Sequence, residues 1–284
     1  MRIVTLMENT LGNQVENMGC VAEHGLSLYI ETSNHKLLLD TGATGAFVDN
    51  AKVLSVDLAQ VDTLVLSHGH YDHAGGIMRF ADINQNASIY MQNKAKFEYY
   101  HKSDIEERYI GIAPEISLLP NVNWVGERMH IDAELELFSN VKGRTLWPNG
   151  NRVLKQKVTD ENGNVMFIQD EFEHEQYLVI SCEGKKVLLS GCAHNGVINI
   201  LEHYQMLYGD APDAMISGFH MMKKTEYTEE EIRGIEETAR ICSRLKTKFF
   251  TGHCTGEHAF EIMKNIMGDQ LQYLHTGDEM FLYN

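Results

Sequence analysis

The run Ser67-His68-Gly69-His70-Tyr71-Asp72-His73-Ala74-Gly75-Gly76 places three imidazoles and a carboxylate close together in the chain. Imidazole nitrogens and carboxylate oxygens are common ligands of divalent transition metals. His68 and His70 would point to the same side of an extended backbone, whereas Asp72 and His73 fall where a short helix is expected to begin. The motif therefore predicts a site for two metal ions, with one pair of ligands for each. A solvated, histidine-rich turn is the alternative.

The residues before this motif indicate where the site lies in the fold. Val61 to Ser67 is an apolar, β-branched run that is typical of a buried strand. The candidate ligands would then leave the end of a strand, where α/β proteins commonly place their chemistry. A zinc finger is excluded, since no two cysteines have the C-x-x-C spacing.

Composition limits the class of protein. A chain of 284 residues without a Pro/Gly/Ser-rich linker is expected to form one domain over residues 1–284. A formal net charge of −16 disfavours nucleic acid or an anionic membrane as partner, which leaves a small-molecule substrate. Five cysteines, an odd number without framework spacing, indicate reduced thiols. No signal sequence or membrane-spanning run is evident, so a cytoplasmic location is expected.

Strand and helix patterns alternate along the chain. Leu26 to Asp40 is predicted to form a hairpin. Thr228 and Glu231 have the spacing of a capping box, which predicts a helix from there to about Leu245. Further helices are expected at 46–54, 93–100 and 196–207, and further strands at 87–91, around Trp124 and Leu135, and at 176–180, 186–190 and 214–217.

The order His-x-His-x-Asp-His after a strand resembles the metallo-β-lactamase superfamily of binuclear metal hydrolases. Three other stretches resemble strands of that family in the same order, namely Leu37 to Gly42, Lys186 to Gly191 and Phe249 to His253. The resemblance spans about residues 35–255. It implies an α/β (α+β) fold of the four-layer αββα sandwich type, with two sheets between outer helices. It also implies two divalent metal ions, which are expected to be Zn, with Mn or Fe as alternatives.

The resemblance implies further ligands after later strands. His253 matches the last metal ligand of the family, and His194 has the same setting. His174 competes with His194 for the third ligand position of the first metal. We favour His194, because His174 between two glutamates equally suits a solvated strand edge.

One position departs from the family pattern. Most relatives carry an aspartate that bridges the metals, where this chain has Cys192. A thiolate can coordinate Zn, so Cys192 is a candidate replacement for that bridge, and otherwise only water or hydroxide would join the metals. Asp40 is expected to orient a ligating histidine without itself touching a metal.

The chemistry expected of such a centre is metal activation of water and stabilisation of a substrate oxyanion. Asp72 would take part as a ligand and catalytic residue. His24 and His220 are candidate proton donors or ligand contacts, although each equally suits a buried core histidine. Asn195 and Thr255 precede glycines at expected helix starts, where anions can bind, and are therefore candidate substrate contacts.

Residues 101–165 interrupt the alternation of strands and helices and include a polar loop from Val141 to Asn164. We expect this segment to be an insertion or lid over the metal cleft. Tyr109 and Trp124 would offer ring surface to a substrate, and Arg108 or Arg144 would meet an anion. The alternative is a dimerisation arm, which would make the protein a homodimer.

Several phrases, among them Gly191 to Gly196, Gly218 to Met221 and His253 to Gly256, resemble the branch that includes the dihydropterin-ribofuranosylaminobenzene-phosphate synthases. The expected function is that of a metal-dependent hydrolase or transferase of a small, phosphorylated or ester substrate. Pterinylmethyl transfer is the first alternative and a non-catalytic binding protein the second. A di-iron redox enzyme is disfavoured, because His70 takes the position where that class has glutamate.

Overall fold

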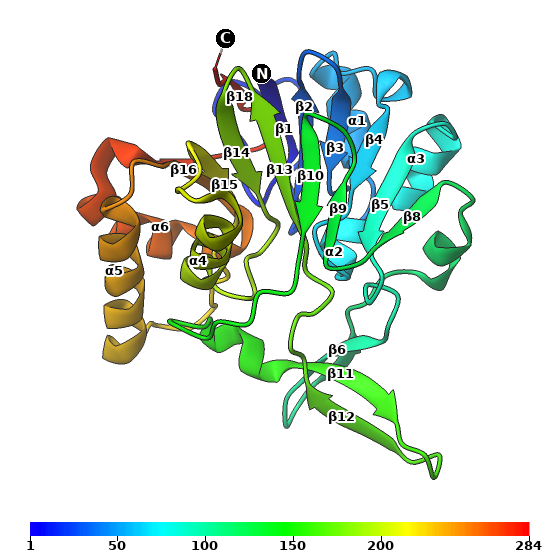
Figure 1. The fold of residues 1–284 in the computed structure, drawn as a ribbon, viewed down its shortest axis with the longest axis vertical. Coiled ribbons are helices and arrows are strands. Elements are labelled where there is room, and N and C mark those ends of the chain that lie inside the picture. Colours follow the sequence, from blue (N-terminus) through cyan, green and yellow to red (C-terminus); the bar gives the residue numbers. More distant parts are fainter. Residues whose placement is uncertain (284) are drawn as a thin grey trace.

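Two seven-stranded sheets pack face to face in the computed structural model, which describes residues 1–283, and helices cover their outer faces (Figure 1). The sheet that holds most of the N-terminal strands, here the N-terminal sheet, has the order β18-β1-β2-β3-β4-β5-β8. The other, here the C-terminal sheet, has the order β17-β16-β15-β14-β13-β10-β9. The arrangement confirms the expected αββα sandwich.

The N-terminal sheet and its helices contain most of the first half of the chain. The predicted hairpin is confirmed as the antiparallel pair β2 and β3, and the helix expected at 46–54 is α1. The elements are β1 (Arg2–Met7), β2 (Ser27–Glu31), β3 (Lys36–Leu39), α1 (Phe47–Val53), η1 (Leu58–Gln60), β4 (Thr63–Val65), α2 (Tyr71–Ala74), α3 (Ile77–Ile83), β5 (Ser88–Gln92), η2 (Pro114–Leu118), β8 (Val122–Val125) and β18 (Glu279–Phe281).

The C-terminal sheet is covered by the three longest helices. The predicted capping box starts α5, where the Thr228 hydroxyl accepts from the Glu231 amide at 3.2 Å and the Glu231 carboxylate accepts from the Thr228 amide at 2.7 Å. The elements are β9 (Arg128–His130), β10 (Leu135–Phe138), β13 (Tyr177–Cys182), β14 (Lys185–Leu189), α4 (Val197–Tyr208), β15 (Ala214–Ile216), α5 (Glu229–Ser243), β16 (Lys248–Thr251), η4 (His253–Thr255), α6 (Glu257–Met267), η5 (Gly268–Gln270) and β17 (Leu271–Tyr273).

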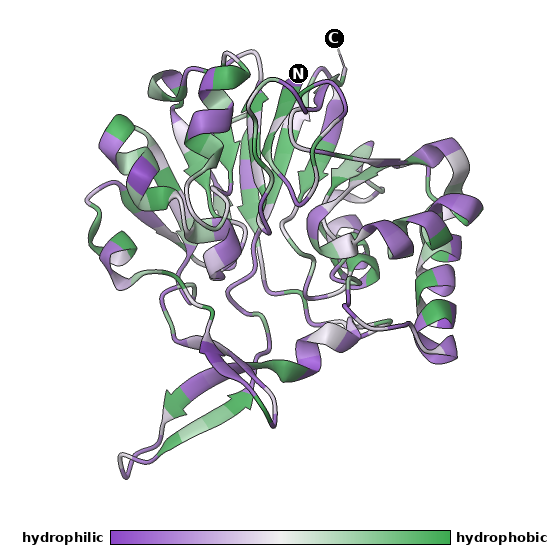
Figure 2. Cartoon of the chain, turned by 180° about the vertical axis from the view of Figure 1, so that it is seen from behind, coloured by the Kyte–Doolittle hydropathy of each residue, from purple (hydrophilic) through white to green (hydrophobic). Residues whose placement is uncertain are grey.

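Three apolar layers hold the sandwich together. Successive residues of a strand face opposite sides of a sheet, so Leu37 of β3 packs between the two sheets whereas Leu38 packs under α1 and α3. In β4, Leu64 faces the helices and Val65 faces the other sheet. The third layer lies between the C-terminal sheet and α4 to α6. Figure 2 shows hydrophobic residues concentrated along the strands of the two large sheets.

A third, four-stranded sheet projects from one end of the sandwich (Figure 1). It has the order β12-β11-β6-β7 and, together with η3, comprises β6 (Tyr99–Lys102), β7 (Glu107–Tyr109), η3 (Asn149–Val153), β11 (Leu154–Thr159) and β12 (Val165–Gln169). Two expectations fail here. The helix predicted at 93–100 is a turn followed by β6, and the loop expected from Val141 to Asn164 contains β11, whose half-buried residues give no clear alternation.

No helix among the described residues is both long enough and apolar enough to cross a lipid bilayer.

Candidate metal centre

The histidine motif occupies the connection after β4, at the carboxyl end of the parallel strands β3, β4 and β5. His68 and His70 lie in the loop, and Asp72 and His73 belong to the one-turn helix α2. Each of the four is at most 8% exposed, so the side chains are withdrawn from bulk water. Gly69 allows this packing, since a Cβ atom at that position would lie 2.7 Å from the carbonyl oxygen of Ala95.

The C-terminal sheet brings three more candidate ligands to the same place. Cys192 and His194 follow β14, and His253 follows β16. The ligating atoms of His68, Cys192 and His194 lie within 4.8 Å of one another, and so do those of His73, Cys192 and His253. Cys192 belongs to both groups. The candidate ligands from the two sheets therefore surround one shared space.

Three of the imidazoles have an unused nitrogen. The Nε2 atoms of His68, His70 and His194 are buried and have no hydrogen-bond partner. Their ring centroids lie 4.6, 4.8 and 4.9 Å apart, so the rings form a compact triangle. The opposite Nδ1 atoms of two of them are held, that of His68 by Ser67 Oγ and that of His194 by Asn151 Oδ1, each at 2.9 Å. Buried nitrogens without partners are costly, and a cation shared by three imidazoles would satisfy them.

The second group gathers around the Asp72 carboxylate. The Nε2 atoms of His73 and His253 lie 3.2 Å apart. Asp72 Oδ2 lies 3.7 Å from the first of these nitrogens and 3.5 Å from the second. His253 Nδ1 is held by Asn9 Oδ1 at 3.0 Å. Two imidazoles and one carboxylate that converge in this way fit a second divalent cation.

The protonation states of three imidazoles suit metal ligation. Burial lowers the pKa of His70 from 6.5 to about 4, and burial also holds the pKa of His68 and His194 well below that ordinary value. These imidazoles are therefore neutral at pH 7, as a metal requires. Burial opposes ionisation of Asp72, but the neighbouring His73, His253 and His24 together outweigh it and lower the pKa of that carboxyl.

Asp40 lies where the sequence analysis expects it, at the end of β3 and outside the ligand groups. Its Oδ2 atom lies 2.7 Å from His73 Nδ1, and its Oδ1 atom accepts from the Ser67 amide at 2.7 Å. Although burial opposes protonation of His73, the two carboxylates beside it raise its pKa to about 9. In this geometry Asp40 fixes the orientation of the His73 ring and leaves Nε2 directed at the centre.

The expectation that His174 lies at a solvated strand edge is wrong. The side chain is fully buried, and both ring nitrogens are used within the protein. Nδ1 accepts from the Gly69 amide at 2.9 Å, and Nε2 lies 3.0 Å from Asp170 Oδ2. His174 thus supports the loop that carries His68 and His70. With both nitrogens engaged, it has none free for the ligand role that the unused Nε2 of His194 offers.

A cavity of about 140 Å³ opens onto these residues. Part of segment 101–165 forms its wall, with His101, Arg108, Ile110 and Leu154 beside the candidate metal ligands. The segment therefore reaches the cleft, as the lid interpretation requires. Arg144 does not line the cavity, and its guanidinium instead pairs with Glu171 and lies over the Trp147 ring, 5.2 Å from the centroid.

His24 and His220 both line this small cavity. His24 is about half exposed at its side chain, and its Nε2 lies 3.4 Å from Asp72 Oδ2. The His220 ring centroid lies 4.1 Å from that of His194, and its buried Nδ1 has no hydrogen-bond partner. His220 also has a φ of 49°, which is unfavourable for a residue with a side chain. Both histidines therefore lie at the wall of the space that the candidate ligands surround.

Four residues expected to contact substrate are engaged elsewhere in the protein, and none lines the small cavity. The Tyr109 hydroxyl donates to the Ile112 carbonyl, and Trp124 packs against the core from β8. The Asn195 amide donates to Glu175 at 2.9 Å, and the Thr255 hydroxyl accepts from the Phe219 amide at 2.9 Å. Their expected roles receive no support from this geometry.

Sequence reasoning missed three residues at the site. Cys254 is buried, and its sulfur lies within 4.8 Å of the ligating atoms of Cys192 and His220. Asp170 and Asn151 hold His174 and His194, respectively. Cys254 follows His253 directly in the sequence, and this adjacency to a candidate ligand was a signal that could have identified it. Asp170 and Asn151 lie in ordinary polar surroundings in the sequence, and only the fold brings them to the centre.

The chain matches the model of the Metallo-beta-lactamase superfamily over residues 21–226. It is 28% identical to the 7,8-dihydropterin-6-methyl-4-(beta-D-ribofuranosyl)-aminobenzene-5'-phosphate synthase of Methanocaldococcus jannaschii, with 97% of this chain and 95% of the synthase covered.

Two solved structures are also similar. Tm1679, described as a metal-dependent hydrolase of the beta-lactamase superfamily, has a TM-score of 0.80 and 26% identity, and both chains are covered completely. Zn(2+)-bound PqqB from Methylobacterium extorquens has a TM-score of 0.53 and 15% identity, with 99% of this chain and 100% of PqqB covered. The second likeness concerns the fold alone.

Proposed function

Because the chain belongs to the metallo-β-lactamase superfamily, we propose that it is a binuclear metal-dependent hydrolase or transferase of a small, phosphorylated or ester substrate. The observation that carries the proposal is the set of three buried Nε2 atoms, on His68, His70 and His194, without hydrogen-bond partners. A protein that used these histidines only for packing would satisfy them with hydrogen bonds. The likeness to Tm1679 supports the same class.

The proposal gives each group of residues a task. His68, His70 and His194 would hold one ion, and Asp72, His73 and His253 would hold the other, with Cys192 between them. Two bound ions, which we propose to be Zn, supply an activated water near neutral pH and stabilise negative charge on a substrate oxygen. Arg108, on the wall of the small cavity, would bind a substrate anion.

Proton transfer falls to the two histidines at the cavity wall. His24 Nε2 lies 3.4 Å from the Asp72 carboxylate, so a proton that this nitrogen takes up can be stabilised there. Burial lowers the pKa of His24, which leaves the imidazole neutral at neutral pH and able to accept a proton. His220 lies against His194 and is the second candidate for proton transfer.

One relative favours a narrower alternative. The synthase of Methanocaldococcus jannaschii covers nearly the whole chain, and its name describes the formation of a pterin-containing phosphate. Pterinylmethyl transfer is therefore the alternative reaction that we propose to test. A binding protein without turnover is the second alternative, since a set of ligands does not by itself establish catalysis.

Metal-reconstituted protein should be assayed against phosphodiester, phosphomonoester, lactone and thioester substrates, with Zn or Mn added. We expect turnover of at least one class that disappears with chelator and in a His194→Ala variant, and that persists in a His130→Ala variant. His130 is exposed on β9 and serves as the matched control. Absence of turnover with all four classes, while metal is bound, would favour the synthase or binding alternatives.

A further inference from the structure

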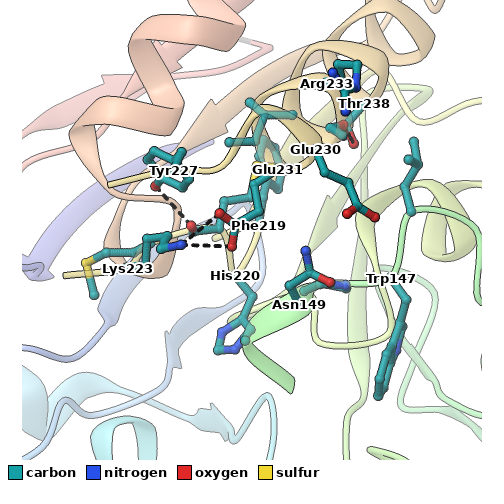
Figure 3. A pocket seen from close by; sticks show the side chains of 17 residues that line it. Trp147, Asn149, Phe219, His220, Lys223, Tyr227, Glu230, Glu231, Arg233 and Thr238 are labelled. Carbon is teal, nitrogen blue, oxygen red and sulfur yellow. Dashed lines mark hydrogen bonds and ion pairs between the residues drawn. The ribbon is translucent and has the colours of Figure 1, made fainter. Parts of the chain in front are cut away.

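A second and larger cavity lies beside the metal cleft. Its volume is about 570 Å³, against about 140 Å³ for the cleft, which is the size range of pockets for drug-sized molecules. Three segments form its walls, namely residues 146–150, residues 219–223 and one face of α5 with Tyr227 shortly before that helix. His220 and Met222 line both cavities, so the two spaces share a wall at these residues. Figure 3 shows His220 at one end of the larger cavity.

A glycine in α5 keeps this cavity open. Glu230, Glu231, Gly234 and Thr238 line it at the spacing of three to four residues that places side chains on one helix face. Glycine is disfavoured in the interior of a helix. Gly234 nevertheless lies at the centre of this face, and a Cβ atom there would meet no atom within 4 Å. A larger side chain would therefore project into empty space without displacing the protein around it.

The chemistry of the walls selects a class of ligand. Trp147, Phe219 and Tyr227 supply aromatic surface. Lys223 is occupied by Glu231, with its Nζ 2.7 and 2.9 Å from the two carboxylate oxygens, as Figure 3 shows.

Glu230 is in a different situation, because no cation pairs with it in the described part of the chain. Its carboxylate points into the cavity (Figure 3). Arg233 also lines the cavity, but its guanidinium lies 3.4 Å from the Glu229 carboxylate. Among the charged wall residues that the structure describes, Glu230 is thus the one without an ion-pair partner, and it favours groups that carry a positive charge or N–H donors.

We propose that this cavity binds an aromatic or heteroaromatic amine. The amine is the non-reacting part of a substrate whose reacting group lies at the metal cleft, with His220 between the two parts. The inference rests on the proposed function for the reacting half only. Binding of a free aromatic amine in the larger cavity does not depend on turnover, so the two ideas can fail separately.

Tryptamine and indole-3-acetate are suitable probes, because they share an indole ring and carry opposite charges. Saturation-transfer NMR with metal-loaded protein should show tryptamine binding with a Kd below about 1 mM and indole-3-acetate binding about tenfold more weakly. Gly234→Leu should weaken tryptamine binding at least about tenfold, because leucine fills the cavity and remains a good helix former. Glu230→Gln should reduce the preference for tryptamine.

The control is Gly126→Leu, at an exposed glycine where a Cβ atom also meets nothing within 4 Å. Circular dichroism and metal content should be the same in all variants. Equal tryptamine affinity in wild type and Gly234→Leu, or no saturable binding to wild type, overturns the cavity assignment. Loss of metal from wild type with tryptamine binding intact refutes the proposed function instead.

Discussion

The metal centre and the larger cavity beside it are built in contrasting ways. At the centre, buried histidines leave the ends of parallel strands, and Ser67, Asn9 and Asn151 fix their second ring nitrogens. The cavity is lined by two irregular segments and by a helix face with a glycine in its middle. The candidate ligands are therefore held at strand ends, and we expect the cavity to tolerate substitution better than the centre does. Chemistry and specificity are separated in this way in many enzymes.

The largest effect is expected from loss of a ligand at the rigid centre. His194→Ala removes one of the three unpartnered Nε2 atoms. Structural zinc sites are worth about 10–16 kcal/mol over four ligands, so one ligand corresponds to an affinity change of about 10²- to 10³-fold. His130→Ala is the control. Metal-competition titration with a chromogenic chelator measures the metal affinity of both variants. Equal affinities would show that His194 is not a metal ligand.

The pH dependence of stability should expose the same contrast. The pKa of His70 is about 4 in the folded protein and 6.5 ordinarily, so the unfolded state binds its proton more tightly. Above pH 6.5 the titration of this histidine therefore does not change the free energy of unfolding. As the pH falls from 6.5 to 4, it lowers the free energy of unfolding by up to about 3 kcal/mol.

Urea denaturation of metal-free protein at several pH values provides the measurement. The stability difference between wild type and His70→Gln should shift against wild type over that pH window and stay constant above it. A difference that does not change with pH would mean that His70 is not desolvated.

A smaller effect is expected at Cys192, which belongs to both ligand groups. Burial raises the pKa of its thiol well above the ordinary value in metal-free protein, and a neighbouring dication should lower it. Cys192→Ser should weaken metal binding about tenfold. Cys242→Ser, at a buried thiol in α5, should leave the affinity unchanged. If Cys192→Ser also leaves metal affinity and the thiol titration unchanged, Cys192 does not contact the metals.

The smallest effect belongs to the cavity. Gly234→Ala replaces a helix-interior glycine without meeting any atom within 4 Å. It should stabilise the protein by about 0.5–1 kcal/mol, because alanine loses less conformational entropy than glycine when a helix forms. Thermal unfolding checks the sign. Destabilisation would show that the cavity wall is packed and not open.

The two regions also differ in how much of each could be predicted from the sequence. The motif around His68 carries its ligands within a few residues, and an apolar strand precedes it, so local pattern was sufficient. The cavity joins residues 146–150, residues 219–223 and α5 through tertiary packing alone. Local pattern also failed at residues 93–100, where Ala95 packs against Gly69 and Tyr99 is buried in β6, so that packing overrides helix propensity.

The residues that hold these histidines in place show the same limit of prediction from sequence. Asp40 could be identified because it ends a strand within a recognisable stretch, and it orients His73. Asp170 holds His174 from an unremarkable polar segment, and nothing in its neighbourhood indicated that role. His174 is buried in contact with Asp170, whereas its two flanking glutamates predict a solvated strand edge.

The central claim is that two groups of buried side chains hold two metal ions. Elemental analysis of protein purified without chelator tests this claim most directly. We expect about two equivalents of transition metal per chain, reduced in His194→Ala and retained in His130→Ala. Less than about half an equivalent, not recovered after addition of Zn, Mn or Fe, would contradict the account.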